Sequence, residues 1–260
     1  MKKISYSRYL MIGLLAGVLV ALPGCAAQND KSTSAEPQTK ASDPAAVETY
    51  TRTDIITSAD EAQQLLVDGN RRFVSGQVLN DDLSAQKRQN LVDKGQHPFA
   101  VVLTCSDSRV PPEVLFDQAL GDVFVVRTAG NVVDAIATGS VEYGAEHLQA
   151  PLLVVMGHEK CGAVKATVEA TEAKAQPEAD HGSAGSIPAI VAKIKPSVEK
   201  AKAAGVAAGE LGEQAATENV KAVMADLEKS PIIKELVEHG KLKVVGAKYH
   251  LGSGQVEWLN

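Results

Sequence analysis

Three short apolar runs constrain the fold of this chain most strongly, because none of them alternates with polar residues. They cover residues 99–104, 123–126 and 152–156. A strand buried on both faces of a parallel sheet has this pattern, whereas a strand with one solvated face alternates. Between the second and third runs, residues 137–148 place Val141 and Leu148 on one helical face. The order strand, helix, strand predicts an α/β fold with a mainly parallel central β-sheet flanked by helices.

Further elements are expected on both sides of these runs. Ser58 and Glu61 have the spacing of a capping box, which predicts a helix start, and Gly76 ends that helix. A second short helix is expected at 84–94 and a last core strand at 241–247, with 255–259 beside it. Residues 171–217 are rich in Ala, Glu, Lys and Gly, and we expect an irregular loop followed by surface helices.

The first 24 residues have the pattern of an export signal. A basic start precedes an uncharged apolar run at 10–22, and Pro23, Gly24 and Cys25 follow it. This run is too short to cross a bilayer, which needs roughly 20 apolar residues. The end of the run resembles a bacterial lipobox, which implies cleavage before Cys25 and acylation of its thiol and its new amino terminus. An ordinary secreted protein with an incidental cysteine is the alternative.

The domain plan follows from these patterns. Residues 1–24 are a lipoprotein signal peptide, and the polar residues 25–55 form a lipid-anchored flexible tether. Residues 56–260 form the folded domain, exported and held at the membrane on the periplasmic or cell-surface side. The net charge of −6, which becomes −9 without the three basic residues of the signal peptide, argues against nucleic acid as a partner.

Metal-binding side chains follow two of the apolar runs. Cys105 comes directly after residues 99–104, and His158 and Cys161 follow residues 152–156. The carboxyl ends of parallel strands meet at one edge of a sheet, where ligands bind. Thiolate and imidazole suit zinc, and three protein ligands leave a fourth position for water, as in catalytic sites. In an exported protein, a disulfide between Cys105 and Cys161 is the alternative, but it explains neither His158 nor Asp107.

Asp107 and Arg109 lie within two and four residues of Cys105. Paired with Arg109, Asp107 can orient a hydroxide on the zinc, or it can bind zinc as a fourth ligand in a closed state. A plain salt bridge that ties a loop is the alternative. Because two thiolates already neutralise the ion, we expect a water pKa above the ~7 of a zinc held by three histidines, and activity that rises toward alkaline pH.

Taken together, residues 105–109, 127–131, 142–143 and 158–162 resemble the β-class carbonic anhydrases, over roughly residues 58–260. The resemblance implies a zinc ion held by Cys105, His158 and Cys161, with Asp107 and Arg109 as the catalytic dyad. The implied reaction is the reversible hydration of carbon dioxide to bicarbonate and a proton in the domain at 56–260.

The resemblance also implies a substrate pocket and an assembly. Gln96 matches a polar pocket position of the family, and Phe124 and Tyr143 match aromatic pocket positions of a subgroup with an open site and no regulatory bicarbonate site. Gly162, beside Cys161, is expected in the same pocket, where a glycine lets the backbone approach closely. Members are homodimers or higher homo-oligomers with pockets lined from both subunits.

Two other functions remain open from the residues. The same zinc centre can hydrolyse carbonyl sulfide or carbon disulfide. Alternatively, a surface lipoprotein can bind zinc without catalysis, in which case protein ligands should close the fourth position.

Overall fold

The computed structural model of the chain describes residues 49–172 and 185–259. The signal peptide, the lipidation site Cys25 and most of the expected tether lie outside the described residues. In the part of the chain that is described, no helix combines the length and apolar character needed to cross a membrane.

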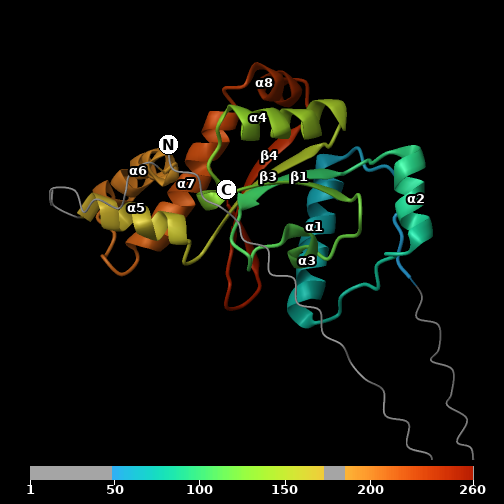
Figure 1. Ribbon diagram of the computed structural model, residues 1–260, viewed down its shortest axis with the longest axis horizontal. Coiled ribbons are helices and arrows are strands. Elements are labelled where there is room, and N and C mark those ends of the chain that lie inside the picture. Colours follow the sequence, from blue (N-terminus) through green and yellow to red (C-terminus); the bar gives the residue numbers. More distant parts are fainter. Residues whose placement is uncertain (1–48, 173–184, 260) are drawn as a thin grey trace, which may run out of the picture. The chain divides into compact units, whose positions relative to one another are not determined.

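A five-stranded sheet forms the centre of the domain, with the strand order β2-β1-β3-β4-β5 (Figure 1). Strands β1 (Ala100–Cys105), β2 (Val123–Thr128), β3 (Leu152–His158) and β4 (Lys243–Tyr249) are parallel, and β5 (Val256–Leu259) pairs antiparallel with β4. Every residue of β1 and β3 is buried. The expected α/β fold with a mainly parallel sheet is therefore confirmed.

Helices cover both faces of this sheet, which explains why the strands do not alternate. Val101 and Leu103 share one core with α4 (Ala135–Glu142), α7 (Leu211–Leu227) and α8 (Pro231–Glu238). Ala100 and Val102 belong to a second core with α1 (Ala59–Ser75) and α3 (Pro112–Leu115). Since successive side chains of a strand point to opposite faces, both sets must be apolar.

The ends of the first two helices fall where the capping residues predict them. The Ser58 hydroxyl accepts a hydrogen bond from the Glu61 amide at 3.4 Å, and Gly76 ends α1 with a φ of 70°. Helix α2 (Ala85–Lys94) begins after Ser84. Helix α4 continues into a π-helical turn, η2 (Tyr143–His147).

Residues 185–217 contain the helices that the sequence predicts, and the second of them is more buried than expected. Helix α6 (Ile187–Ala203) lies on the surface with one buried face, whereas α7 is largely buried, and both share a core with α5 (Gly162–Glu172). Small side chains such as Ala201 and Ala215 let these helices pack closely, and both residues are fully buried. Cys105 and Cys161 belong to this same core. The helices therefore cover the edge of the sheet where the metal ligands were expected.

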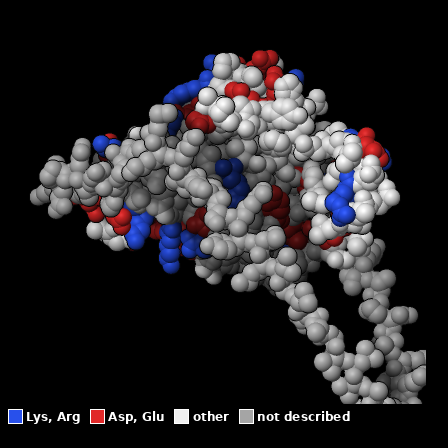
Figure 2. Space-filling view, viewed as in Figure 1, with Lys and Arg blue, Asp and Glu red and all other residues white. Residues whose placement is uncertain are grey.

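The packed region begins before residue 56. Tyr50 forms a bridge with Asp81. The Arg52 guanidinium lies 4.7 Å from the ring centre of Phe99 and donates a hydrogen bond to Gln118 at 2.9 Å. The last residues of the stretch predicted to be a tether thus contact the domain. On the face shown in Figure 2, basic and acidic side chains are interspersed, without one dominant basic patch.

Candidate metal centre

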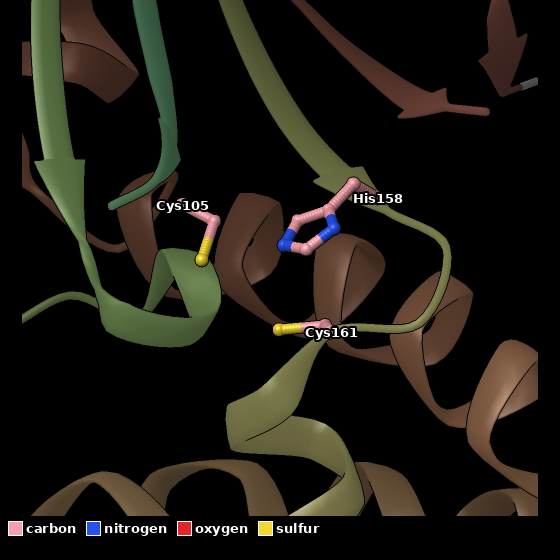
Figure 3. Close-up of side chains that lie close together, drawn as sticks. All are labelled: Cys105, His158 and Cys161. Carbon is pink, nitrogen blue, oxygen red and sulfur yellow. The ribbon is translucent and has the colours of Figure 1, made fainter. Parts of the chain in front are cut away.

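The three predicted ligands converge on one point (Figure 3). The ligand atoms of Cys105, His158 and Cys161 all lie within 4.8 Å of one another, and all three residues are buried. Cys105 is the last residue of β1 and His158 the last residue of β3, which are neighbouring parallel strands. A turn through Lys160, at a φ of 52°, then brings Cys161 to the start of α5. The chain thus delivers one ligand from each strand end and one from a helix start.

The orientation of His158 fits a metal. Its Nδ1 lies 2.8 Å from the Glu159 carbonyl oxygen, so Nδ1 carries the proton and Nε2 the lone pair. Nε2 has no hydrogen-bond partner, and the residue is completely buried. A buried polar atom without a partner is costly. A zinc ion between this nitrogen and the two sulfurs removes that cost and matches the preference of zinc for these ligands.

Both cysteines are free thiols, so the alternative disulfide between them is not formed. The interaction with Cys161, together with the backbone N–H groups of Asp107 and Gly130, lowers the pKa of the Cys105 thiol. The same interaction with Cys105 raises the pKa of Cys161. Ionisation of one sulfur therefore opposes ionisation of the other, and a divalent cation would remove this opposition because metals bind thiolates. The pair is suited to a cation and poorly suited to remaining unbound.

Asp107 lies beside the ligands and is held by Arg109. The Arg109 side chain donates to Asp107 Oδ1 at 2.9 Å and to Oδ2 at 2.7 Å. This guanidinium holds the pKa of Asp107 well below its usual range. Oδ2 is 3.9 Å from Nε2 of His158, so the carboxylate is close to the position where a fourth metal ligand would bind. The structure therefore brings Asp107, Arg109 and the three ligands together.

Two further residues support the segment that carries Cys105. Arg127 donates to the backbone oxygens of Cys105 at 3.0 Å and of Asp107 at 2.5 Å. In the short turn η1 (Ala129–Asn131), the Gly130 amide donates to Cys105 Sγ at 3.3 Å. The sequence identified residues 127–131 only as a motif, because side-chain contacts with a loop 22 residues away leave no local pattern.

Three expected pocket residues lie far from the metal centre of their own chain. Gln96 precedes β1, whereas Cys105 ends it. Phe124 pairs with Val101, which lies on β1 four residues before Cys105. At ~3.3 Å per residue, Phe124 is therefore about 13 Å from Cys105 along the strand direction. Tyr143 lies beside Phe124, with 6.0 Å between the ring centres. Within one chain these residues cannot contact a substrate at the metal.

Gly162 lies next to Cys161, at the first position of α5. A Cβ atom there would meet nothing within 4 Å, so no close approach of this chain's own atoms requires a glycine. Among the described residues of one chain, Gly162 thus leaves open space beside a metal ligand, and the interpretation that it permits close backbone approach stays a prediction.

Two thiolates and one imidazole at the carboxyl edge of a parallel sheet, with a carboxylate next to the fourth position, define a zinc enzyme of the α/β class. The family model for carbonic anhydrase matches residues 100–256. A carbonic anhydrase of Mycolicibacterium smegmatis is 42% identical over 197 residues, which cover 75% of this chain and 91% of that protein. Carbonic anhydrase 2 of Mycobacterium tuberculosis is 38% identical over 199 residues, 76% of this chain and 92% of that protein.

Solved structures show the same fold. The β-carbonic anhydrase of Coccomyxa, in complex with acetazolamide, aligns with a TM-score of 0.56 and 30% identity, over 75% of this chain and 84% of that one. A β-carbonic anhydrase of Aspergillus fumigatus aligns with a TM-score of 0.58 and 27% identity, over 68% of this chain and 83% of that one. The chain belongs to the β-class carbonic anhydrases. It catalyses the reversible hydration of carbon dioxide with zinc as its cofactor.

Proposed function

We propose that Cys105, His158 and Cys161 hold the catalytic zinc and that Asp107 and Arg109 form the catalytic dyad. The unpartnered, fully buried Nε2 of His158, which faces two thiols within 4.8 Å, carries this proposal. Zinc held there lowers the pKa of a water ligand and so makes a nucleophile available near neutral pH.

In this proposal Asp107 is the residue that orients the nucleophile. Arg109 keeps the Asp107 carboxylate ionised, and an ionised carboxylate can only accept hydrogen bonds. Asp107 therefore accepts a hydrogen bond from the attacking oxygen and directs the oxygen's lone pair at the carbon of carbon dioxide. Arg109 donates to both carboxylate oxygens and leaves each a further lone pair, so Asp107 can still accept the hydrogen bond while its orientation is held by Arg109, which supports an open site in which Asp107 does not ligate the metal.

A zinc measurement combined with a stopped-flow hydration assay tests the assignment on the full chain. Cys161→Ser should lose both zinc and turnover, whereas Cys25→Ser should keep both. Zinc bound at one equivalent without turnover at any pH would contradict the proposal and favour the non-catalytic zinc protein. The same assay with carbonyl sulfide and carbon disulfide distinguishes a hydrolase from a carbonic anhydrase. A hydrolase would turn over these two substrates in preference to carbon dioxide.

We further propose that the active unit is at least a homodimer in which each pocket combines two chains. Three expected pocket residues lie at the end of the strands opposite the zinc ligands, so they cannot contact the zinc of their own chain. They are Gln96, Phe124 and Tyr143. Tyr143 remains 48% exposed and Ile136, on the adjacent α4, 79% exposed. A second copy that covers these apolar groups brings the pocket residues to the zinc of its partner.

Finally, we propose that the enzyme is exported and anchored through acylated Cys25. The support is in the sequence: the basic start, the apolar run at 10–22 and the position of Cys25 directly after it. Labelling bacteria that express the chain with radioactive palmitate should label the wild type and leave Cys25→Ser unlabelled and released from membranes. Equal labelling of both proteins would contradict the anchor.

A further inference from the structure

We propose that helix α7 aligns the metal centre through two positioning residues, Glu213 and Asn219. Each holds one of the two backbone segments that carry the zinc ligands. The inference rests on the ligand assignment of the proposed function. It gives a role to part of residues 171–217, for which the sequence pattern suggested none.

Glu213 holds the segment between His158 and Cys161. Its Oε1 accepts a hydrogen bond from the Lys160 amide at 2.8 Å. Lys160 has a φ of 52°, a left-handed conformation that is unfavourable for a residue with a Cβ. Such a conformation persists only where its surroundings impose it. The contact with Glu213 is a side-chain constraint on this turn, beside the hydrogen bond from the Glu159 amide to the Tyr249 carbonyl at 3.0 Å, and it helps to set the separation between the imidazole and the Cys161 sulfur.

The other oxygen of Glu213 is fixed on the sheet. Lys248 on β4 approaches Oε2 at 2.7 Å, and only 10% of the Lys248 side chain is exposed. Lys248 pairs in register with Gly157, the residue before His158. Glu213 therefore connects the ligand turn to the strand that neighbours β3, so the turn cannot shift independently of the sheet.

Asn219 holds the segment next to Cys105. Its side-chain amide donates to the Gly130 carbonyl at 2.8 Å, and the residue is 1% exposed. The amide of the same Gly130 donates to Cys105 Sγ at 3.3 Å. Asn219 thus fixes the position of a residue whose N–H is directed at the Cys105 sulfur, a contact that orients the ligand and favours its thiolate.

In the same region, α7 packs directly against the end of β3. A Cβ on Gly157 would come within 2.7 Å of Val220 and 3.5 Å of the Ala216 carbonyl, so helix and strand are in close contact. Glu213 and Asn219 are separated by about 9 Å along the helix axis, at ~1.5 Å per residue. One rigid element consequently sets the spacing of both ligand segments.

Zinc retention tests this inference on the full chain. The rate of zinc transfer to a chromogenic chelator would be measured for Glu213→Ala and Asn219→Ala, with far-UV circular dichroism to confirm folding. Loss of contacts that orient metal ligands typically costs 10–100-fold in affinity, so we expect zinc release at least about tenfold faster in each variant. Glu213→Gln keeps an oxygen that accepts from Lys160 and should restore much of the retention.

Glu218→Ala is the matched control. Glu218 is another carboxylate of α7, more buried than Glu213, and it pairs with Lys200 and Lys221 instead of a ligand segment. Its variant should release zinc at the wild-type rate. Wild-type rates for Glu213→Ala, or equally fast release from Glu218→Ala, would overturn the positioning role. A wild-type chain without bound zinc would instead overturn the ligand assignment, and the positioning role with it.

Discussion

At the residue scale, the balance between Asp107 and Arg109 decides how the metal centre works. The carboxylate is only 17% exposed, and its two oxygens accept hydrogen bonds from one guanidinium. Without Arg109, an ionised carboxylate beside a cation would be expected to bind it directly. The bidentate contact instead keeps the carboxylate ionised and directed, since paired hydrogen bonds fix geometry as well as charge.

Asp107→Asn therefore separates orientation from metal binding. The amide has nearly the same shape, but it loses the charge and can donate as well as accept, so it no longer selects one orientation of the nucleophile. We expect kcat to fall on the order of 100-fold while zinc stays bound, because positioned proton acceptors typically contribute 10²–10⁴-fold. Stopped-flow kinetics and zinc analysis measure the two effects. Asp68→Asn, in the exposed Asp68–Arg71 pair of α1, should change neither, and full activity of Asp107→Asn would contradict the dyad.

At the scale of elements, the turn η1 depends on a glycine that no other residue can replace. Gly130 has a φ of 69°, and a Cβ there would come within 2.7 Å of Ile194 and 3.0 Å of Ala163. Gly130→Ala should cost about 1–2 kcal/mol for the left-handed backbone and a further ~1–3 kcal/mol for the overlap. Because the Gly130 amide donates to Cys105, zinc content should fall as well.

Urea unfolding and zinc analysis of the purified variant check this prediction. Gly76→Ala is its control, since Gly76 has a φ of 70° but open space around it. That variant should show the backbone cost alone and normal zinc content. A Gly130→Ala protein no less stable than Gly76→Ala would show that the contact of η1 with α5 and α6 is unimportant.

The contact between α6 and α7 should depend on pH through Glu218. A hydrogen bond from Lys200 holds the pKa of Glu218 below its ordinary value of 4.5. Since the unfolded chain binds this proton more readily, the stabilisation is complete above that value and disappears as pH falls through the lower pKa of the folded state. In urea unfolding, the wild type should exceed Glu218→Gln in stability at pH 7, and the two should converge as the pH falls well below 4.5. A difference that is constant with pH would contradict this account.

At the scale of the whole molecule, the sequence predicts what is local and misses what is distant. Buried strands and capped helices carry their patterns within a few residues, and the ligands follow strand ends, so all of these could be predicted. The burial of α7 could not, because the small side chains of an Ala-rich face give only a weak apolar signal. The contacts of Glu213 and Asn219 join residues 53 and 89 positions apart, a separation at which no sequence pattern exists.

Whether one chain is a complete enzyme also depends on the whole molecule, because the expected pocket residues lie far from the zinc ligands of their own chain. If Gln96 serves the zinc of a second subunit, then Gln96→Ala and His158→Ala damage different halves of each pocket. Co-expression of the two variants should create mixed dimers with one intact site, since each undamaged half meets the other across the interface. Random assembly makes half of the dimers mixed, so about a quarter of all sites should regain wild-type turnover.

The measurement is the turnover per chain of the purified mixture, compared with each variant alone. Co-expression of His158→Ala with Asp107→Asn is the control, because both changes lie on the metal side of the pocket and no mixed dimer contains an intact site. Recovery with Gln96→Ala and none with Asp107→Asn requires a pocket shared between chains. Recovery in neither mixture would mean that Gln96 has no role across the interface, and the open substrate side of the zinc would then have to be closed by residues of the same chain.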